Sequence, residues 1–174
     1  MNRQQVEQRT EELFRGGLHC AEAVLQAVLE SQDVDQATFS PKVATAFGGG
    51  VGRSKKGLCG ALSGGLIALG YLRGRSTPEE SWEEIAMTAD ELRARFTEEY
   101  GCSRCGVVLE RLGPQEKMAK CVRLAGNTAG MVFEALAEEA APCPAQACGC
   151  GCTQLHAPEP TPAPTPSSCG CGGT

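Results

Sequence analysis

The stretch from Thr77 to Gly101, TPEESWEEIAMTADELRARFTEEYG, carries the clearest helix signal in the chain. It opens with Thr77, Pro78 and Glu80, a capping box with proline at the first helical position. Apolar side chains then recur at spacings of 3, 4, 3 and 4 residues, at Trp82, Ile85, Ala89, Leu92 and Phe96. This period places them on one face of a helix, which we expect to run from Thr77 to Gly101.

Helical periodicity extends over most of the remaining chain. A second apolar stripe follows the break at Gly16 and Gly17 and consists of Cys20, Ala21, Val24, Leu25, Val28 and Leu29. Ser40-Pro41 predicts a short helix ending at Gly48, 58–72 reads as a core helix, and Gly113-Pro114 predicts the start of a last one. That last helix would carry Met118, Cys121, Val122, Ala125, Ala129, Val132 and Leu136. Because no stretch alternates with period 2, we predict an all-α, compact multi-helix bundle.

The composition divides the chain near residue 140. Residues 141–174 hold seven of the ten prolines and six of the eleven cysteines, but Leu155 is the one large aliphatic side chain there. Such a segment buries too little apolar surface to offset the entropy of ordering it. We therefore predict a helical four-cysteine domain over 1–140 and a disordered Cys/Pro/Gly-rich tail over 141–174.

Charge and hydropathy exclude two classes of protein. The net charge of −5 argues against nucleic-acid binding, which needs a basic face. The uncharged apolar run 58–72 is 15 residues and too short for a transmembrane segment. The first twelve residues lack the apolar core of a secretion signal, so we expect a cytoplasmic protein whose thiols are kept reduced.

The glycine-rich segment 47–57, FGGGVGRSKKG, is not a phosphate-binding loop, because Leu58 and Cys59 stand where the lysine and hydroxyl residue of such a loop belong. Two interpretations stay open. The segment is either a flexible connection between helices or a loop whose backbone N–H groups approach a group bound beside Cys59.

The hexapeptide Cys59-Gly60-Ala61-Leu62-Ser63-Gly64 reads C-G-A-x-x-G and follows this loop. One cysteine, Cys20, lies upstream, and Cys105 and Cys121 lie downstream. In these features residues 13–135 resemble the C_GCAxxG_C_C family, small helical redox-active proteins with four cysteines in this order. The resemblance implies redox activity at Cys20, Cys59, Cys105 and Cys121 without naming a reaction. Cys102 is an additional cysteine, so the third position falls on Cys105 or on Cys102.

The surroundings of these cysteines predict reactive thiolates. Cys20, Cys59 and Cys105 each fall in the first turn of an expected helix, where free N–H groups favour an anion. Basic residues near the cysteines in sequence add to this effect: Arg53, Lys55 and Lys56 before Cys59, Arg104 before Cys105, and Lys117, Lys120 and Arg123 around Cys121. We therefore expect lowered thiol pKa values.

The sequence leaves open what these thiolates bind or form. Four would hold an iron–sulfur cluster or a zinc ion, whereas Cys102-x-x-Cys105 suggests a reversible dithiol without cofactor. His19, beside Cys20, is a candidate base or ligand. A third alternative gives the cysteines no chemical role. Each would then be a small buried apolar side chain, and the protein would be a helical adaptor.

The tail suggests a second function. Its cysteines alternate with glycine at Cys148, Cys150, Cys152, Cys169 and Cys171, with Cys143 upstream and His156 between the clusters. Such runs suit a soft ion such as copper or zinc, or a thiophilic metalloid. The alternative function is thus metal sequestration by the tail. If the protein is redox-active, we expect a redox partner protein. Gly60 and Gly64 are compatible with a homodimer and equally with close helix packing inside one chain.

Overall fold

The computed structural model describes residues 1–35 and 37–138. This part of the chain forms six α-helices and one 3-10 helix and contains no β-strand, which confirms the all-α prediction. The elements are α1 (Arg3–Arg15), α2 (Cys20–Ser31), η1 (Pro41–Phe47), α3 (Gly60–Arg73), α4 (Glu83–Tyr100), α5 (Cys105–Leu112) and α6 (Ala119–Glu138). The predicted tail, 141–174, lies outside the described residues, so its disorder and its metal site stay predictions.

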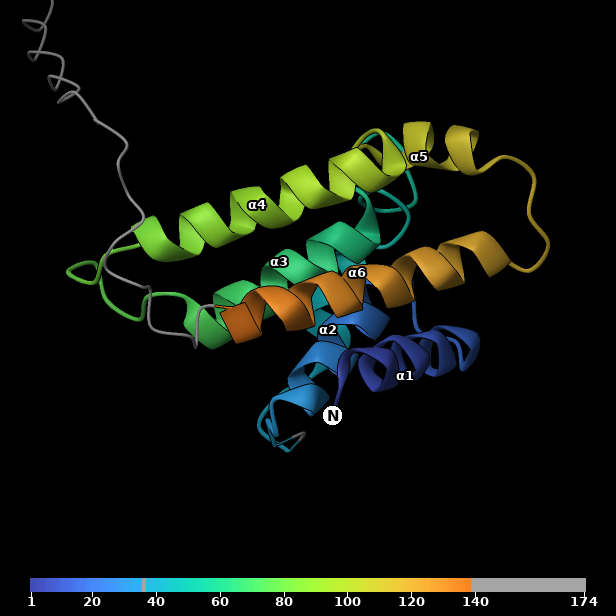
Figure 1. The fold of residues 1–174 in the computed structure, drawn as a ribbon. Helices are drawn as coiled ribbons and strands as arrows, with labels where there is room; N and C mark the ends of the chain where they lie inside the picture. Colours follow the sequence, from blue (N-terminus) through green and yellow to red (C-terminus); the bar gives the residue numbers. More distant parts are fainter. Residues whose placement is uncertain (36, 139–174) are drawn as a thin grey trace, which may run out of the picture. The chain divides into compact units, whose positions relative to one another are not determined.

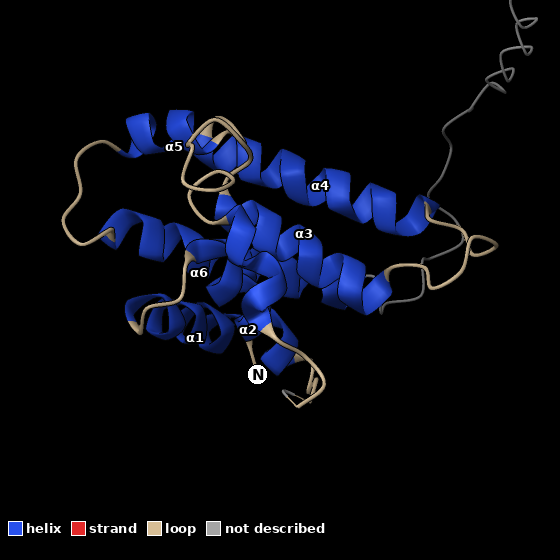
Figure 2. Ribbon diagram, turned by 180° about the vertical axis from the view of Figure 1, so that it is seen from behind, coloured by secondary structure: helices blue, strands red, loops and turns tan. Residues whose placement is uncertain are grey.

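Helices α3 and α6 lie in the middle of the bundle, with α4 on one side and α1 and α2 on the other (Figures 1 and 2). Helix α6 packs against α1, α2, α3 and α4, and α2 also packs along α3. The short helix α5 follows the C-terminal end of α4 (Figure 1). Among the described residues, no helix combines the length and apolar character needed to cross a bilayer.

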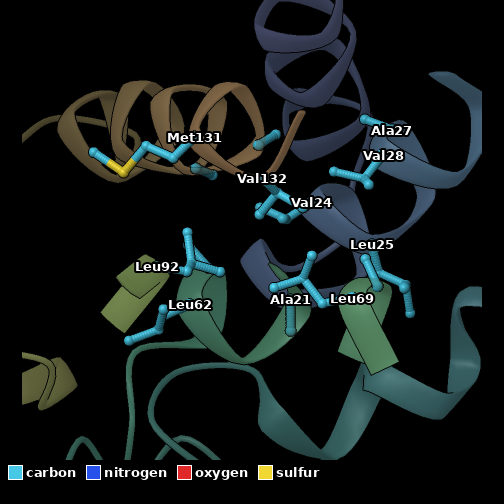
Figure 3. Packing of buried hydrophobic residues seen from close by; sticks show 14 of the residues in the cluster. Ala21, Val24, Leu25, Ala27, Val28, Leu62, Leu69, Leu92, Met131 and Val132 are labelled. Atoms are coloured by element: carbon cyan, nitrogen blue, oxygen red, sulfur yellow. The ribbon is translucent and has the colours of Figure 1, made fainter. Parts of the chain in front are cut away.

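The core is built from the apolar stripes that the sequence predicts. Val24 and Leu25 of α2 face Leu69 of α3 and Val132 of α6, and Leu92 of α4 closes the layer (Figure 3). All five side chains are at most 1% exposed, and each contributes about 1.5–3 kcal/mol by leaving water. This packing fixes α2, α3, α4 and α6 relative to one another.

Most predicted helix ends are confirmed. Gly16 follows the end of α1, Ser40 caps η1, and Gly101 ends α4 in the left-handed conformation with a φ of 72°. The predicted start of α4 was wrong by six residues, because the helix begins at Glu83 and not at Thr77. Thr77 and Glu80 form an isolated turn, in which the Glu80 carboxylate accepts a hydrogen bond from the Ser76 N–H at 2.7 Å. Trp82 consequently lies outside the core and is 62% exposed.

The start of the last helix also differs from the prediction. Gly113 has a φ of 67°, and Lys117 and Met118 also have positive φ, so α6 begins at Ala119. Met118 therefore lies before the helix and not on its apolar stripe. The segment 113–118 forms a loop that brings Gln115 back against the first turn of α6.

Candidate functional site

A cavity of about 320 Å³ lies at the N-terminal ends of four helices. Cys20, Cys59, Cys105 and Cys121 all line this cavity, although the first and the last are 101 positions apart in the sequence. Cys59 and Cys105 are buried, at 6% and 7% exposure, whereas Cys20 and Cys121 are partly exposed. The structure thus brings together the four cysteines that the resemblance singles out, and all four are free thiols.

Each of these cysteines lies at the beginning of a helix. Cys20 and Cys105 are the first residues of α2 and α5, Cys59 directly precedes α3, and Cys121 is the third residue of α6. The first N–H groups of a helix lack partners within it and attract negative charge. The dipoles of four such ends around one cavity favour an anionic group inside it, although at α5 and α6 the first N–H groups already donate to Gly57, Lys55 and Gln115.

A two-residue bridge holds Cys59 beside Cys105. Leu58 and Arg104 pair in antiparallel fashion. The N–H of Cys59 donates to the carbonyl of Ser103 at 2.7 Å, and the N–H of Cys105 donates to the carbonyl of Gly57 at 3.0 Å. These backbone bonds fix both cysteines without using their sulfurs.

The glycines of the C-G-A-x-x-G motif allow α2 and α3 to meet. A Cβ atom at Gly60 would overlap the sulfur of Cys20, and one at Gly64 would overlap the backbone of Ala21. The close approach anticipated from these glycines therefore occurs within one chain, between the starts of two helices. It places Cys20 against the residue that follows Cys59.

The glycine-rich loop is ordered by its own hydrogen bonds. Every N–H group from Val51 to Gly57 donates to an oxygen within 46–54, for example that of Arg53 to Gly48 at 3.0 Å and that of Lys55 to Gly49 at 3.0 Å. The interpretation as a flexible connection is therefore wrong, because hydrogen bonds order the loop. The second interpretation stays a prediction for Gly49, which lines the cavity together with Cys59. The loop also brings Arg53 and Lys55 to the cavity wall.

The expected lowering of the thiol pKa values was wrong for three cysteines. Burial, and then the nearby charge of Cys20, raise the pKa of Cys59 to about 12, although the N–H groups of Ala61 and Leu62 oppose the rise. Burial and then Cys20 likewise raise the pKa of Cys105, and Lys55 opposes this only in part. Basic residues that are close in sequence do not lie close enough to compensate for desolvation.

Gln115 is a site residue that the sequence analysis missed. Its side-chain oxygen accepts hydrogen bonds from the N–H groups of Lys120 and Cys121, both at 3.0 Å, so it caps α6. Its side-chain nitrogen donates to the sulfur of Cys121 at 3.2 Å. Burial raises the pKa of Cys121, and this hydrogen bond works against the rise. A glutamine four residues before a helix has no recognised capping pattern, so no sequence signal identified it.

Cys102 and His19 differ in their relation to the cavity. Cys102 does not line it, and its sulfur accepts a hydrogen bond from the Arg104 N–H at 3.4 Å. His19 lines it, and the His19 N–H donates to the Glu22 carboxylate at 2.7 Å. The structure therefore places Cys105, and not Cys102, on the cavity wall.

Within 1–35 and 37–138, no group of three or more His, Cys, Asp or Glu side chains is arranged to hold a metal ion. The four cavity sulfurs thus surround a common space without converging on one point.

Residues 18–135 match a family model described as "Putative redox-active protein (C_GCAxxG_C_C)". The chain belongs to the C_GCAxxG_C_C family. The match covers Cys20, Cys59, Cys105 and Cys121 and ends before the cysteine-rich tail. No curated protein and no solved structure gives a significant match.

Proposed function

We propose that this C_GCAxxG_C_C protein is a thiol–disulfide redox protein in which Cys20 and Cys59 form the reacting pair. The observation that carries this proposal is the convergence of four free thiols on one cavity. Oxidation of two thiols to a disulfide releases two protons and two electrons. A disulfide on the reaction partner accepts the two electrons and the two protons and becomes two thiols, so no further oxidant is required.

The choice of Cys20 and Cys59 follows from their surroundings. The Cys20 sulfur lies against Gly60, which follows Cys59 in the chain. Together with burial, the charge of Cys20 raises the pKa of both Cys59 and Cys105, so the contact with Gly60 is what favours Cys59 as its partner. Cys20 is partly exposed and Cys59 is buried, so an external disulfide reaches Cys20 first, and Cys59 resolves the mixed disulfide from inside.

A four-thiolate iron–sulfur cluster is the second candidate function. It is favoured by the same four cysteines, the donor set of many such clusters, and by the basic side chains of Arg53 and Lys55 at the cavity. Cys20, Cys59, Cys105 and Cys121 would hold it, and it would supply one-electron transfer. We place it second because it requires a cofactor, whereas the dithiol reaction uses the cysteines of this chain alone. Copper, zinc or metalloid capture by the tail remains a separate prediction, since those cysteines lie outside the described residues.

The test is oxidation of the full-length reduced protein in mixtures of reduced and oxidised dithiothreitol, followed by alkylation and peptide mass spectrometry. We expect a Cys20–Cys59 disulfide that forms and disappears reversibly. Cys102→Ser is the matched control because Cys102 does not line the cavity, and it should leave this disulfide unchanged. Cys59→Ser should abolish it. If Cys20 and Cys59 stay reduced in the folded protein while other thiols oxidise, the proposal is wrong.

A parallel reconstitution under anaerobic conditions separates the two candidates. Absorption near 400 nm, with iron and sulfide in stoichiometric amounts that Cys59→Ser removes, would establish the cluster instead. Metal that is lost on deletion of 141–174, but retained in Cys59→Ser, would assign metal binding to the tail.

A further inference from the structure

Arg53 and Lys55 give the cavity a charge opposite to that of the chain. Arg53 and Lys55 both line the cavity, and the charge of Lys55 opposes the rise in the pKa of Cys105, whereas no aspartate or glutamate among the described residues lines the cavity. Neither side chain forms an ion pair or a side-chain hydrogen bond within the described part of the chain. In a protein with a net charge of −5, two unpaired cations beside four thiols are a distinctive local feature.

The backbone at both residues supports a functional role. Arg53 has a φ of 62° and Lys55 a φ of 59°, in the left-handed region that non-glycine residues avoid. Each costs about 1–2 kcal/mol relative to an unstrained backbone. Both side chains extend from an exposed loop, so burial in the core does not compensate for this cost. Strain of this kind is typical of residues held for binding.

Apart from His19 and two glycines, the remaining wall is apolar. Phe14, Val108, Leu109, Met118 and Leu124 line the cavity together with the cysteines. A volume of about 320 Å³ lies at the lower end of the range for small-molecule sites. The cavity therefore suits a short carbon skeleton that carries negative charge at one end and reaches the sulfurs with the other.

We propose that the cavity binds a small carboxylate-bearing disulfide as the substrate of the thiol pair, with Arg53 and Lys55 holding its carboxylates. This inference rests on the proposed function and adds the substrate class. Guanidinium and ammonium groups form charge-assisted hydrogen bonds with carboxylates. A small acidic substrate is thus held with its sulfur–sulfur bond beside Cys20.

The reaction balances without a further reagent. The Cys20 thiol loses its proton, and its sulfur attacks the substrate disulfide, whose sulfur–sulfur bond breaks. The first leaving thiolate takes up that proton, and a mixed disulfide remains on Cys20. The Cys59 thiol then loses its proton, and its sulfur attacks the Cys20 sulfur, so the second substrate thiolate leaves and is protonated. The protein dithiol is oxidised by two electrons, and the substrate is reduced to two thiols.

The test compares three disulfides of similar size and different charge: the dianion 3,3′-dithiodipropionate, neutral 2-hydroxyethyl disulfide and dicationic cystamine. The readout is the rate at which the Cys20–Cys59 disulfide forms, followed by acid quenching and peptide mass spectrometry. Each rate is divided by that of the uncharged thiol 2-mercaptoethanol with the same reagent, which removes differences in intrinsic reactivity without adding a charge preference. We expect the corrected rate for the dianion to exceed that for cystamine at least about tenfold, and the ratio to fall with added salt.

Variants of the loop give the matched controls. Arg53→Gln combined with Lys55→Gln should bring the ratio close to 1, whereas Lys56→Gln, in the same loop but not on the cavity wall, should leave it unchanged. The single variants and a thermal melt of each protein show whether any loss reflects misfolding. Equal corrected rates for all three reagents, or a double variant that is folded and keeps the preference, would overturn the substrate assignment while leaving the thiol pair intact. Failure of every reagent to form the disulfide would instead refute the proposed function.

Discussion

The sulfur of Cys20 lies against the backbone of Gly60, so the first residue of α2 touches the first residue of α3. No side chain fits between them. The C-G-A-x-x-G motif therefore has a packing role that is separate from thiol chemistry, since its glycines set how closely two cysteine-bearing helix ends approach each other.

Alanine substitutions in α3 should separate close packing from helix propensity. Gly64→Ala would push a methyl group into the backbone of Ala21, which cannot yield like a side chain, and should lower the free energy of unfolding by about 3 kcal/mol. Gly60→Ala should displace Cys20 and cost about 1–3 kcal/mol. The control is Gly70→Ala, since nothing lies within 4 Å of that position. It should stabilise the protein by about 0.5–1 kcal/mol. Urea unfolding of the three variants checks this, and equal effects at all three positions would contradict it.

The side-chain amide of Gln115 should affect Cys121 in two ways: its nitrogen donates to the Cys121 sulfur, and its oxygen caps the helix that carries Cys121. In Gln115→Glu, the carboxylate still accepts from the N–H groups of Lys120 and Cys121 but no longer donates to the sulfur, and its negative charge opposes the thiolate. We expect the pKa of Cys121 to rise further with little loss of stability. Gln115→Ala also removes the helix cap and should cost about 1 kcal/mol.

The rate of iodoacetamide labelling of Cys121 as a function of pH measures the first effect, and urea unfolding measures the second. Glu116→Gln, in the same loop, provides the control variant. An unchanged labelling profile in Gln115→Glu would show that the hydrogen bond at 3.2 Å does not tune this thiol.

The core could be predicted from sequence because its signals are local and periodic. Val24 and Leu25 lie on a stripe that only a helix generates, and both are fully buried. The starts of α4 and α6 could not be predicted in the same way. Thr77–Glu80 closes a turn of its own, and the capping partner of α6 is Gln115, which reaches back from the preceding loop. Local patterns do not show which of two competing hydrogen-bond arrangements the chain adopts.

The sequence could indicate which cysteines share the cavity, but not the electrostatics around them. The order of the cysteines singles out Cys20, Cys59, Cys105 and Cys121, which share one cavity wall. Their pKa values depend instead on burial and on the other sulfurs, both of which are tertiary properties. The role of Lys55 likewise depends on a strained loop conformation that the string of glycines permits but does not specify.

Glu134 should make the stability of the bundle depend on acid. Its carboxylate pairs with Arg3 of α1 at 2.6 Å and with Arg95 of α4 at 2.7 Å. Burial raises the pKa of Glu134, but the two arginines outweigh it and lower the pKa below the ordinary value of 4.5. A lowered pKa means that this stabilisation is present above about pH 4.5 and is lost as the pH falls through the pKa of the folded protein.

Glu134→Gln should therefore be less stable by about 1 kcal/mol at pH 7, and the difference should shrink as the pH falls below 4.5. Urea unfolding between pH 3 and pH 7 measures this. Asp90→Asn removes an exposed ion pair with Arg93 and should change stability by less than about 0.5 kcal/mol. A constant difference between Glu134→Gln and the unaltered protein at every pH would rule out the ion-pair explanation.

Cys59 should make the reduced protein sensitive to alkali. Its pKa is about 12 in the folded protein, against an ordinary value of 9.0. Above pH 9 the unfolded chain therefore loses this proton while the folded chain keeps it, so stability falls as the pH rises toward 12. A full proton difference corresponds to ~1.4 kcal/mol per pH unit. Cys105 and Cys121, whose pKa values are also raised, add to the same slope.

The measurement is the free energy of unfolding in urea at pH 7.5, 9 and 10, under reducing conditions. Cys59→Ser removes the ionisable group and should flatten the decline between pH 9 and pH 10, whereas Cys102→Ser, away from the cavity, should keep the slope of the unaltered protein. Comparing slopes and not absolute stabilities cancels the packing cost of each serine. Because the raised pKa keeps Cys59 protonated at pH 8, iodoacetamide should label Cys59 last among the thiols of the folded protein. Rapid labelling of Cys59, together with equal slopes in the two variants, would mean that its thiol is neither buried nor held in the protonated form.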